Sequence, residues 1–223
     1  MDMLDICDLA YGAARLTGVP GQPALAVVDL ARVDWAGSDP RAAITALAGS
    51  EFAAWRAQTP VGAVPSGDEP VLLERVGDVL TVTLNRPERH NAFGRAVRDG
   101  LIDALEVAHL DPTIAEVVLT GAGRSFCSGG DLDEFGTAAD PVAAHLVCLA
   151  RSADWAIHRV RDRMTARVHG ACIGAGVEVV PGAGGTVSIT RRIGRWLTSY
   201  LALSGARLDA GTALEWGLVD GIV

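Results

Sequence analysis

Residues 79–168 alternate between strand-like and helix-like patterns, and this alternation restricts the fold more than any other feature of the chain. Residues 79–84 alternate apolar and polar side chains, which is the period of a half-buried strand. Residues 114–120 and 164–168 are further strand-like runs. Because parallel strands need a long crossover between them, the order strand, helix, strand, helix, strand predicts a mostly parallel sheet covered by helices.

The two stretches between these strands carry apolar residues three and four positions apart, the spacing of one helix face. The first face comprises Val97, Leu101, Ala104, Leu105 and Ala108. The second helix is predicted to start at Asp140–Pro141, with a face of Val142, Leu146, Ala150, Ala153 and Ile157. A turn at Asn85–Arg86–Pro87 ends the first strand, and near the C-terminus Asp209 is predicted to cap a helix stopped by Gly217.

A proline- and glycine-rich stretch, TPVGAVPSGDEP at residues 59–70, is predicted to be a linker that divides the chain. Residues 1–58 form a folded α/β appendage in this interpretation, with a strand at residues 25–30 and a helix that starts at Asp39–Pro40. The appendage has no motif that indicates chemistry, and its role is unknown. Residues 71–223 form the main domain.

Composition and charge exclude several classes of protein. The 223 residues include 19 basic and 27 acidic ones, a net charge of −8 that would repel nucleic acid. The chain has no run of ~20 apolar residues that could span a membrane, and its acidic start, MDMLDICDLA, does not resemble a secretion signal. Four scattered cysteines, Cys7, Cys127, Cys148 and Cys172, predict free thiols and no metal site. We therefore expect a cytoplasmic protein.

Two glycine-rich turns follow predicted strands, and they are the strongest candidates for a functional site. They read GRSFCSGGDL at residues 123–132 and HGACIGAGVE at residues 169–178. Neither matches the phosphate-binding loop of nucleotide hydrolases or the nucleophile elbow of serine hydrolases. Two such turns side by side can direct backbone N–H groups at one oxyanion from two directions.

Six motifs in order over residues 71–223 resemble those of the crotonase (enoyl-CoA hydratase/isomerase) superfamily. They are TVTLNRP at 81–87 with Asn91–Ala92, VVLTG at 117–121, SFCSGGDL at 125–132, VHGACIGAGVE at 168–178, PGAGGT at 181–186, and LSG at 203–205 with Ala213 and GLV at 217–219. The resemblance implies an α/β fold, a spiral of repeated ββα units. It also implies an acyl-CoA substrate with no further cofactor, and a homo-oligomer, a trimer or hexamer.

The same resemblance implies the site residues. Two backbone N–H groups, those of Cys127 and Ala175, would stabilise a thioester enolate, and Glu178 would help to activate water or exchange a proton. Arg86 or Arg89 would meet a phosphate of CoA. The predicted substrate-binding residues are Arg86, Asn91, Ala92, Ser128, Gly129, Gly130, Asp131, Leu132 and Gly174.

The chain departs from the family pattern after Glu178, where two valines lead directly into Pro181. The family continues with a helix, a strand and a loop that carries a second glutamate, and here there is no room for them. Either the sequence lacks residues that the molecule contains, or the deletion is genuine. We favour the first, because a deletion would expose apolar faces at ~25 cal/mol per Å². The family's C-terminal helices, which complete its trimer, are also expected to be absent because the sequence lacks residues that the molecule contains.

Two function classes stay open. The first is an acyl-CoA enzyme, a hydratase or an isomerase. The second is a non-catalytic paralogue that binds acyl-CoA or a partner subunit, which the absent second glutamate favours. The related serine-protease branch receives little weight, because the expected turns carry no Ser–His pair. His169 is predicted to hydrogen-bond the second turn, and Asp131 to cap the helix that follows it.

Overall fold

The computed structural model describes residues 69–134, 150–179 and 185–223, together with positions 54, 57, 58, 137 and 147. Apart from positions 54, 57 and 58, the predicted appendage lies outside these residues, as does most of the linker, so the predictions for both stay predictions. The chain divides into two units. We call the described residues from 69 to 179 the sheet unit and residues 185–223 the helical unit, and we describe each by itself.

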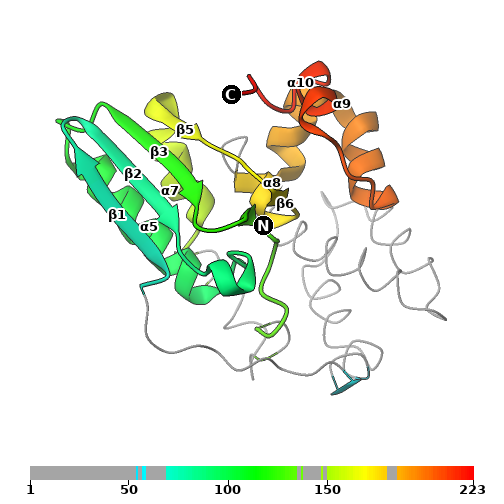
Figure 1. Ribbon diagram of the computed structural model, residues 1–223, viewed down its shortest axis with the longest axis horizontal. Helices are drawn as coiled ribbons and strands as arrows, with labels where there is room; N and C mark the ends of the chain where they lie inside the picture. Colours follow the sequence, from blue (N-terminus) through cyan, green and yellow to red (C-terminus); the bar gives the residue numbers. More distant parts are fainter. Residues whose placement is uncertain are drawn as a thin grey trace. The chain divides into compact units, whose positions relative to one another are not determined.

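The sheet unit contains a four-stranded sheet in the order β1-β2-β3-β5 (Figure 1). Strand β2, Val79–Leu84, pairs in parallel with β3, Glu116–Gly121, which pairs in parallel with β5, Met164–Ala166. Strand β1, Val71–Val76, is antiparallel to β2 and forms the edge. The predicted parallel sheet with helical connections is confirmed, and the predicted bounds of β2 match those of the structure.

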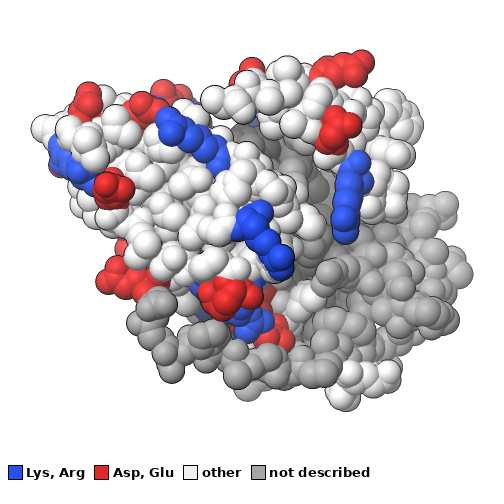
Figure 2. Space-filling model, viewed as in Figure 1, with Lys and Arg blue, Asp and Glu red and all other residues white. Residues whose placement is uncertain are grey.

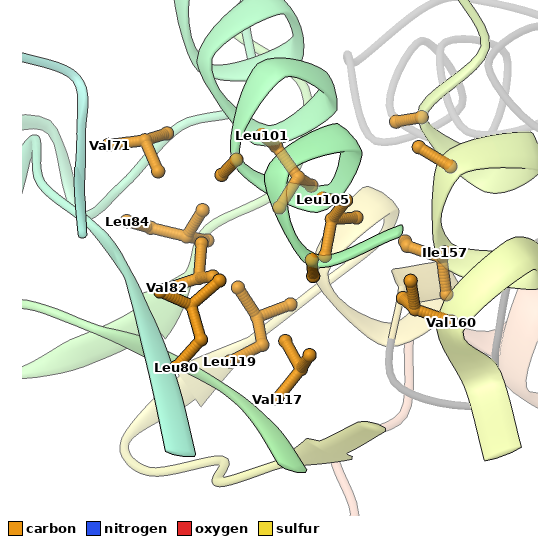
Figure 3. Packing of buried hydrophobic residues seen from close by; sticks show 14 of the residues in the cluster. Val71, Leu80, Val82, Leu84, Leu101, Leu105, Val117, Leu119, Ile157 and Val160 are labelled. Carbon is orange, nitrogen blue, oxygen red and sulfur yellow. The ribbon is translucent and has the colours of Figure 1, made fainter. Parts of the chain in front are cut away.

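Helix α5, Arg95–Leu110, covers one face of this sheet, and all five residues of its predicted apolar face are buried. It packs on alternate residues of β2, namely Leu80, Val82 and Leu84, which are at most 3% exposed. Figure 3 shows these side chains meeting Leu101 and Leu105 of the helix. Side chains repeat every two residues on the strand and every 3.6 residues on the helix, and the apolar faces that result pack against each other in one core.

Helix α7, Ala153–Val160, completes this core with Ile157 and Val160 (Figure 3). It begins at Ser152, whose hydroxyl accepts a hydrogen bond from the amide of Trp155 at 3.3 Å. The prediction of one continuous helix from residue 140 is wrong at this point. A new helix starts at residue 153, and Ala150, which was assigned to the buried face, is exposed.

Two short strands make a second sheet beside the first. Strand β4, Ser125–Cys127, and strand β6, Ala171–Cys172, pair in parallel. Helix α8, Ala175–Val179, follows β6 after a short turn and is one turn long. The 3-10 helices η1, Pro87–Arg89, and η2, Arg161–Arg163, complete the unit.

The helical unit consists of α9, Gly185–Ser204, and α10, Ala210–Glu215. Helix α9 is kinked at Gly194, whose φ is 76°. The predicted cap of α10 is confirmed, because Asp209 accepts a hydrogen bond from the amide of Thr212 at 2.7 Å. Gly217, with φ of 75°, ends the turn that follows, as predicted.

Two properties of the surface bear on the predicted partners. On the face that Figure 2 shows, acidic and basic side chains of the described residues are interspersed, without a broad basic patch. Among the helices of the described residues, none combines the length and the apolar character that crossing a membrane requires.

An ion-pair cluster on α5 gives a prediction about pH. Partial burial alone would raise the pKa of Asp99, but hydrogen bonds from Arg98 and Arg151 (3.0 and 2.7 Å) outweigh it and hold that pKa below its ordinary value. The hydrogen-bonded Asp99 carboxylate therefore stabilises the folded protein fully above pH ~3.9, the pKa of aspartate in the unfolded chain. This stabilisation is lost as the pH falls through the lower pKa of Asp99 in the folded protein. Because the Asp99 side chain is still 39% exposed and solvent screens its ion pairs, the expected loss is a few tenths of a kcal/mol.

Urea unfolding of the wild type and of Asp99→Asn between neutral and strongly acidic pH measures this term. The free energy of unfolding is expected to be larger for the wild type at neutral pH, and the difference between the two proteins is expected to disappear in acid. A difference that stays constant over this pH range contradicts the role of the ionised carboxylate.

Candidate functional site

The two glycine-rich turns lie side by side because the short strands within them, β4 and β6, are paired. Cys127 lies opposite Cys172 in this ladder, and the amide of Ile173 donates a hydrogen bond to the carbonyl of Cys127 at 3.0 Å. The sequence-based expectation that the turns are neighbours is confirmed.

The first turn of α8 packs directly against the end of β4. A Cβ atom added at Gly176 would lie 2.9 Å from both the Cβ and the carbonyl oxygen of Cys127, closer than real side chains approach. Glycine at this position therefore lets the main chain of α8 reach that of β4. Ala175 is the first residue of α8, and Glu178 follows it by three positions. The first N–H groups of a helix have no acceptor within the helix, so they are available to other groups.

The thiols at this junction have the character of packing groups. Cys127 is 1% exposed and Cys172 is half-buried, and neither forms a disulfide. Burial, with a smaller effect from Cys127, raises the pKa of Cys172 to about 12. A thiol with so high a pKa is protonated at neutral pH and unreactive.

Among the described residues, no three His, Cys, Asp or Glu side chains gather as a metal site would require.

The backbone after β4 is held against the segment that precedes α5. The amide of Ser128 donates to the carbonyl of His90 at 2.9 Å. The amide of Phe93 donates to the carbonyl of Gly129 at 2.7 Å, and the amide of Asp131 donates to the carbonyl of Phe93 at 3.0 Å. Gly129 has φ of 101°, a conformation that favours glycine. These bonds, with the bridge between Phe93 and Gly130, fix the course of the first turn.

Asn91, a predicted substrate-binding residue, has a structural role here, and its contact with a substrate stays a prediction. It is 0% exposed, and its Oδ1 accepts from the amide of Arg86 at 2.8 Å. Its Nδ2 donates to the carbonyls of Ala122 at 2.9 Å and Ser125 at 2.8 Å. The side chain thus joins the turn after β2 to the loop before β4, and no part of it faces solvent.

Arg86 and Asp131 also lie inside the protein. Arg86 is 9% exposed, and its guanidinium donates to Asp131 Oδ2 at 2.9 Å. Arg89 donates to Asp131 Oδ1 at 3.0 Å and forms a further ion pair with Asp133. The hydrogen bond that Arg89 donates to the Asp133 carboxylate, opposed in part by burial, raises the pKa of Arg89. Arg86 is thus committed to an internal carboxylate, and contact of either arginine with a CoA phosphate stays a prediction.

The other predicted substrate-binding residues occupy different positions. Ala92 is buried, and its carbonyl accepts a hydrogen bond from Arg86 at 3.5 Å. Gly129 is buried, whereas Ser128, Gly130, Leu132 and Gly174 are half-buried. These last four have surface available to a ligand.

A histidine–serine contact was not predicted from the sequence. His90 Nδ1 lies 2.9 Å from Ser125 Oγ, and its Nε2 lies 3.0 Å from a guanidinium nitrogen of Arg124. Because a guanidinium can only donate, Nε2 accepts and Nδ1 carries the proton that it donates to Ser125. In this arrangement His90 cannot take the proton of Ser125, so the pair does not form an activated serine. The bond predicted from His169 to the second turn is wrong in its partner: His169 Nε2 donates to the carbonyl of Gly123, the first residue of the first turn, at 3.1 Å.

Asn91→Asp is expected to lower the free energy of unfolding by about 1–3 kcal/mol. The substitution replaces the Nδ2 donor by an oxygen that faces the carbonyls of Ala122 and Ser125, leaving both without this partner. Chemical denaturation measures the loss. Asn85→Asp is the control, because the Asn85 side chain donates to Glu69 in an exposed position. Equal effects of the two substitutions would contradict the structural role of Asn91.

The fold and the paired turns define an α/β protein with a backbone-lined site at the ends of parallel strands. Residues 74–180 match the family model described as Enoyl-CoA hydratase/isomerase. The 2,3-dehydroadipyl-CoA hydratase of Escherichia coli is 32% identical over 177 residues, which covers 68% of this chain and 68% of the relative. The crystal structure of enoyl-CoA hydratase from Thermoplasma volcanium is 30% identical with a TM-score of 0.61, covering 70% of this chain and 72% of the other. The chain belongs to the enoyl-CoA hydratase/isomerase family and has the crotonase fold.

The comparisons also bear on the short junction after Glu178. The match to the family model ends at residue 180, directly before Pro181. The alignment with the Escherichia coli hydratase runs over 177 positions but takes in 68% of 223 residues, about 152. About 25 positions of that alignment therefore have no residue in this chain. The sequence is thus shorter than this relative within the matched region.

Proposed function

We propose that this chain is an acyl-CoA enzyme of the hydratase/isomerase type. The amides of Cys127 and Ala175 hold the thioester oxygen as negative charge develops on it, and Glu178 moves a proton at the carbon next to the thioester. Coenzyme A enters as part of the substrate, and the reaction needs no other cofactor. The family matches support the acyl-CoA class.

One observation carries this proposal: the close approach of α8 to the end of β4. The hydrogen bond from Ile173 to Cys127 and the absence of a side chain at Gly176 keep the two main chains together. Backbone donors fixed before the reaction are worth ~2.7–4 kcal/mol each in comparable sites, because they need no reorganisation as charge develops. The residue identities Cys, Ala and Gly matter here for their small size.

Glu178 lies in the same helix as Ala175, three residues further on. Residues three apart in a helix are neighbours on its surface, so donor and proton carrier belong to one short rigid element. A carboxyl group in an apolar site beside a thioester can exchange protons near neutral pH.

The homo-oligomeric state that the family implies is part of the proposal as well.

The second candidate function is binding of acyl-CoA without turnover. The brevity of α8, Ala175–Val179, and the shortfall of about 25 positions against the Escherichia coli hydratase favour it. If the missing positions fall directly after Glu178, the second carboxylate that hydration uses in the family is absent.

The purified chain is tested with crotonyl-CoA, whose conjugated thioester loses ultraviolet absorbance when water adds, and with a 3-enoyl-CoA, which gains it when the double bond migrates. Calorimetric titration with butyryl-CoA measures binding. Turnover of either substrate supports the enzyme, and the substrate that reacts identifies the subclass. Binding without turnover supports the second candidate. Absence of binding contradicts both.

A further inference from the structure

Asp131 lies in the turn that follows β4, and its side chain bonds to Arg86, Arg89 and the amide of Asp133. Its side chain is 2% exposed. Oδ2 accepts from Arg86 at 2.9 Å, and Oδ1 accepts from Arg89 at 3.0 Å and from the amide of Asp133 at 3.2 Å. A buried carboxylate is costly unless it is paired and hydrogen-bonded. Both oxygens meet that condition, so the position of this side chain is tightly determined.

The main chain of Asp131 is part of the same arrangement. Its amide donates to the carbonyl of Phe93 at 3.0 Å, and Phe93 in turn donates to Gly129 at 2.7 Å. Four residues before Asp131, Cys127 is the last residue of β4. The backbone from Cys127 to Asp131 is therefore held at one end by the β4–β6 ladder and at the other end by Asp131.

We propose that Asp131 is a positioning residue for the reaction: through Arg86 and Arg89 it fixes the backbone that directs the Cys127 amide at the thioester oxygen. This inference rests on the proposed function. A hydrogen bond weakens steeply as its angle falls toward ~120°, and a productive site holds its groups within ~0.5 Å and 10–20°. Without the Asp131 carboxylate the backbone bonds to His90 and Phe93 remain, but the far end of the turn loses its bonds to Arg86 and Arg89, and the Cys127 amide can then rotate beyond that range.

A purely structural ion pair makes a different prediction from a positioning residue. Loss of a structural pair lowers the fraction of folded protein and leaves each folded molecule fully active. Loss of positioning lowers kcat in folded molecules and weakens the polarisation of the bound carbonyl, while KM changes little because the rest of the thioester still binds.

The experiment uses butyryl-CoA labelled with carbon-13 at the carbonyl, a saturated thioester that does not react. Infrared difference spectra give the carbonyl stretch of the bound ligand, and crotonyl-CoA, or the 3-enoyl-CoA if that is the substrate, gives kcat and KM per active site. The wild type is compared with Asp131→Asn and with Leu101→Ala, a core substitution on α5 that destabilises the sheet unit without touching the turn.

The wild type is expected to lower the stretching frequency of the bound carbonyl. Asp131→Asn is expected to lose most of that shift and about 10–10³-fold in kcat, whereas Leu101→Ala keeps both. A wild-type shift that Asp131→Asn retains, with unchanged kcat, overturns the positioning role alone. Absence of the shift in the wild type overturns the proposed function and this inference with it. If Asp131→Asn does not fold, Arg89→Gln removes one of the two partners, and a full shift in that variant overturns the inference.

Discussion

Glu178→Gln is expected to lower turnover of an enoyl-CoA by about 10²–10⁴-fold, the range that one general acid–base group contributes. Glutamine has nearly the shape of glutamate but cannot accept or release a proton at neutral pH. The amides of Cys127 and Ala175 stay in place, so binding of butyryl-CoA is expected to be retained. Steady-state kinetics and calorimetric titration of the same preparation measure the two quantities.

Glu215→Gln is the matched control. Glu215 is the last residue of α10 in the helical unit and is exposed, so the same chemical change is made on a surface helix. Full activity is expected for this variant. If Glu178→Gln also retained its turnover, the role of Glu178 in proton transfer would be wrong, and a water molecule or another carboxyl group would have to carry the proton.

The parts of the fold that could be predicted are those in which one local period decides burial. Helix α5 buries one face, from Val97 to Ala108, and β2 buries alternate residues. In both, the apolar pattern of the sequence predicts the buried side chains correctly. The cap at Asp209 was predictable for a similar reason, since its side chain bonds an amide three residues away. Only local chemistry enters these predictions.

The elements that were missed depend on distant partners. Strand β1 is mostly exposed after Val71 and shows no alternation, so its pairing with β2 identifies it only in the structure. Strands β4 and β6 have three and two residues, too few for a period. The break before α7 came from Ser152, whose capping hydroxyl interrupts a run of helix formers.

The candidate site divides in the same way. Motif order located both glycine turns, but the strands that pair them, β4 and β6, were not predicted. The roles of Asn91, Arg86 and Asp131 could not be predicted, because a polar residue in a motif looks the same whether it contacts a ligand or holds a turn. Their contacts reach 31 to 45 residues along the chain, from Asn91 to Ala122 and from Arg86 to Asp131. Motif membership therefore identified important positions but not the reason for their importance.

Gly176→Val is expected to lower kcat by about 10²–10³-fold, the effect of losing one oxyanion donor. A Cβ at this position would lie 2.9 Å from the Cβ and the carbonyl oxygen of Cys127, so α8 and β4 must move apart. That movement separates the amides of Ala175 and Cys127, which the proposed function requires to converge on one oxygen. Steady-state kinetics measure kcat, and the carbonyl stretch of bound butyryl-CoA is expected to return toward its value in solution.

Gly211→Val in α10 is the control for this substitution. Both positions are helical glycines, so the change in helix propensity is comparable. The contact within 4 Å of an added Cβ at Gly211 is a carboxylate oxygen of Asp209 at 3.3 Å, the end of an exposed side chain that can move. The control is therefore expected to keep its kcat. If Gly176→Val folded and kept its kcat as well, two converging main-chain donors would not be the source of catalysis, whereas a loss confined to Gly176→Val ties the reaction to the contact between α8 and β4.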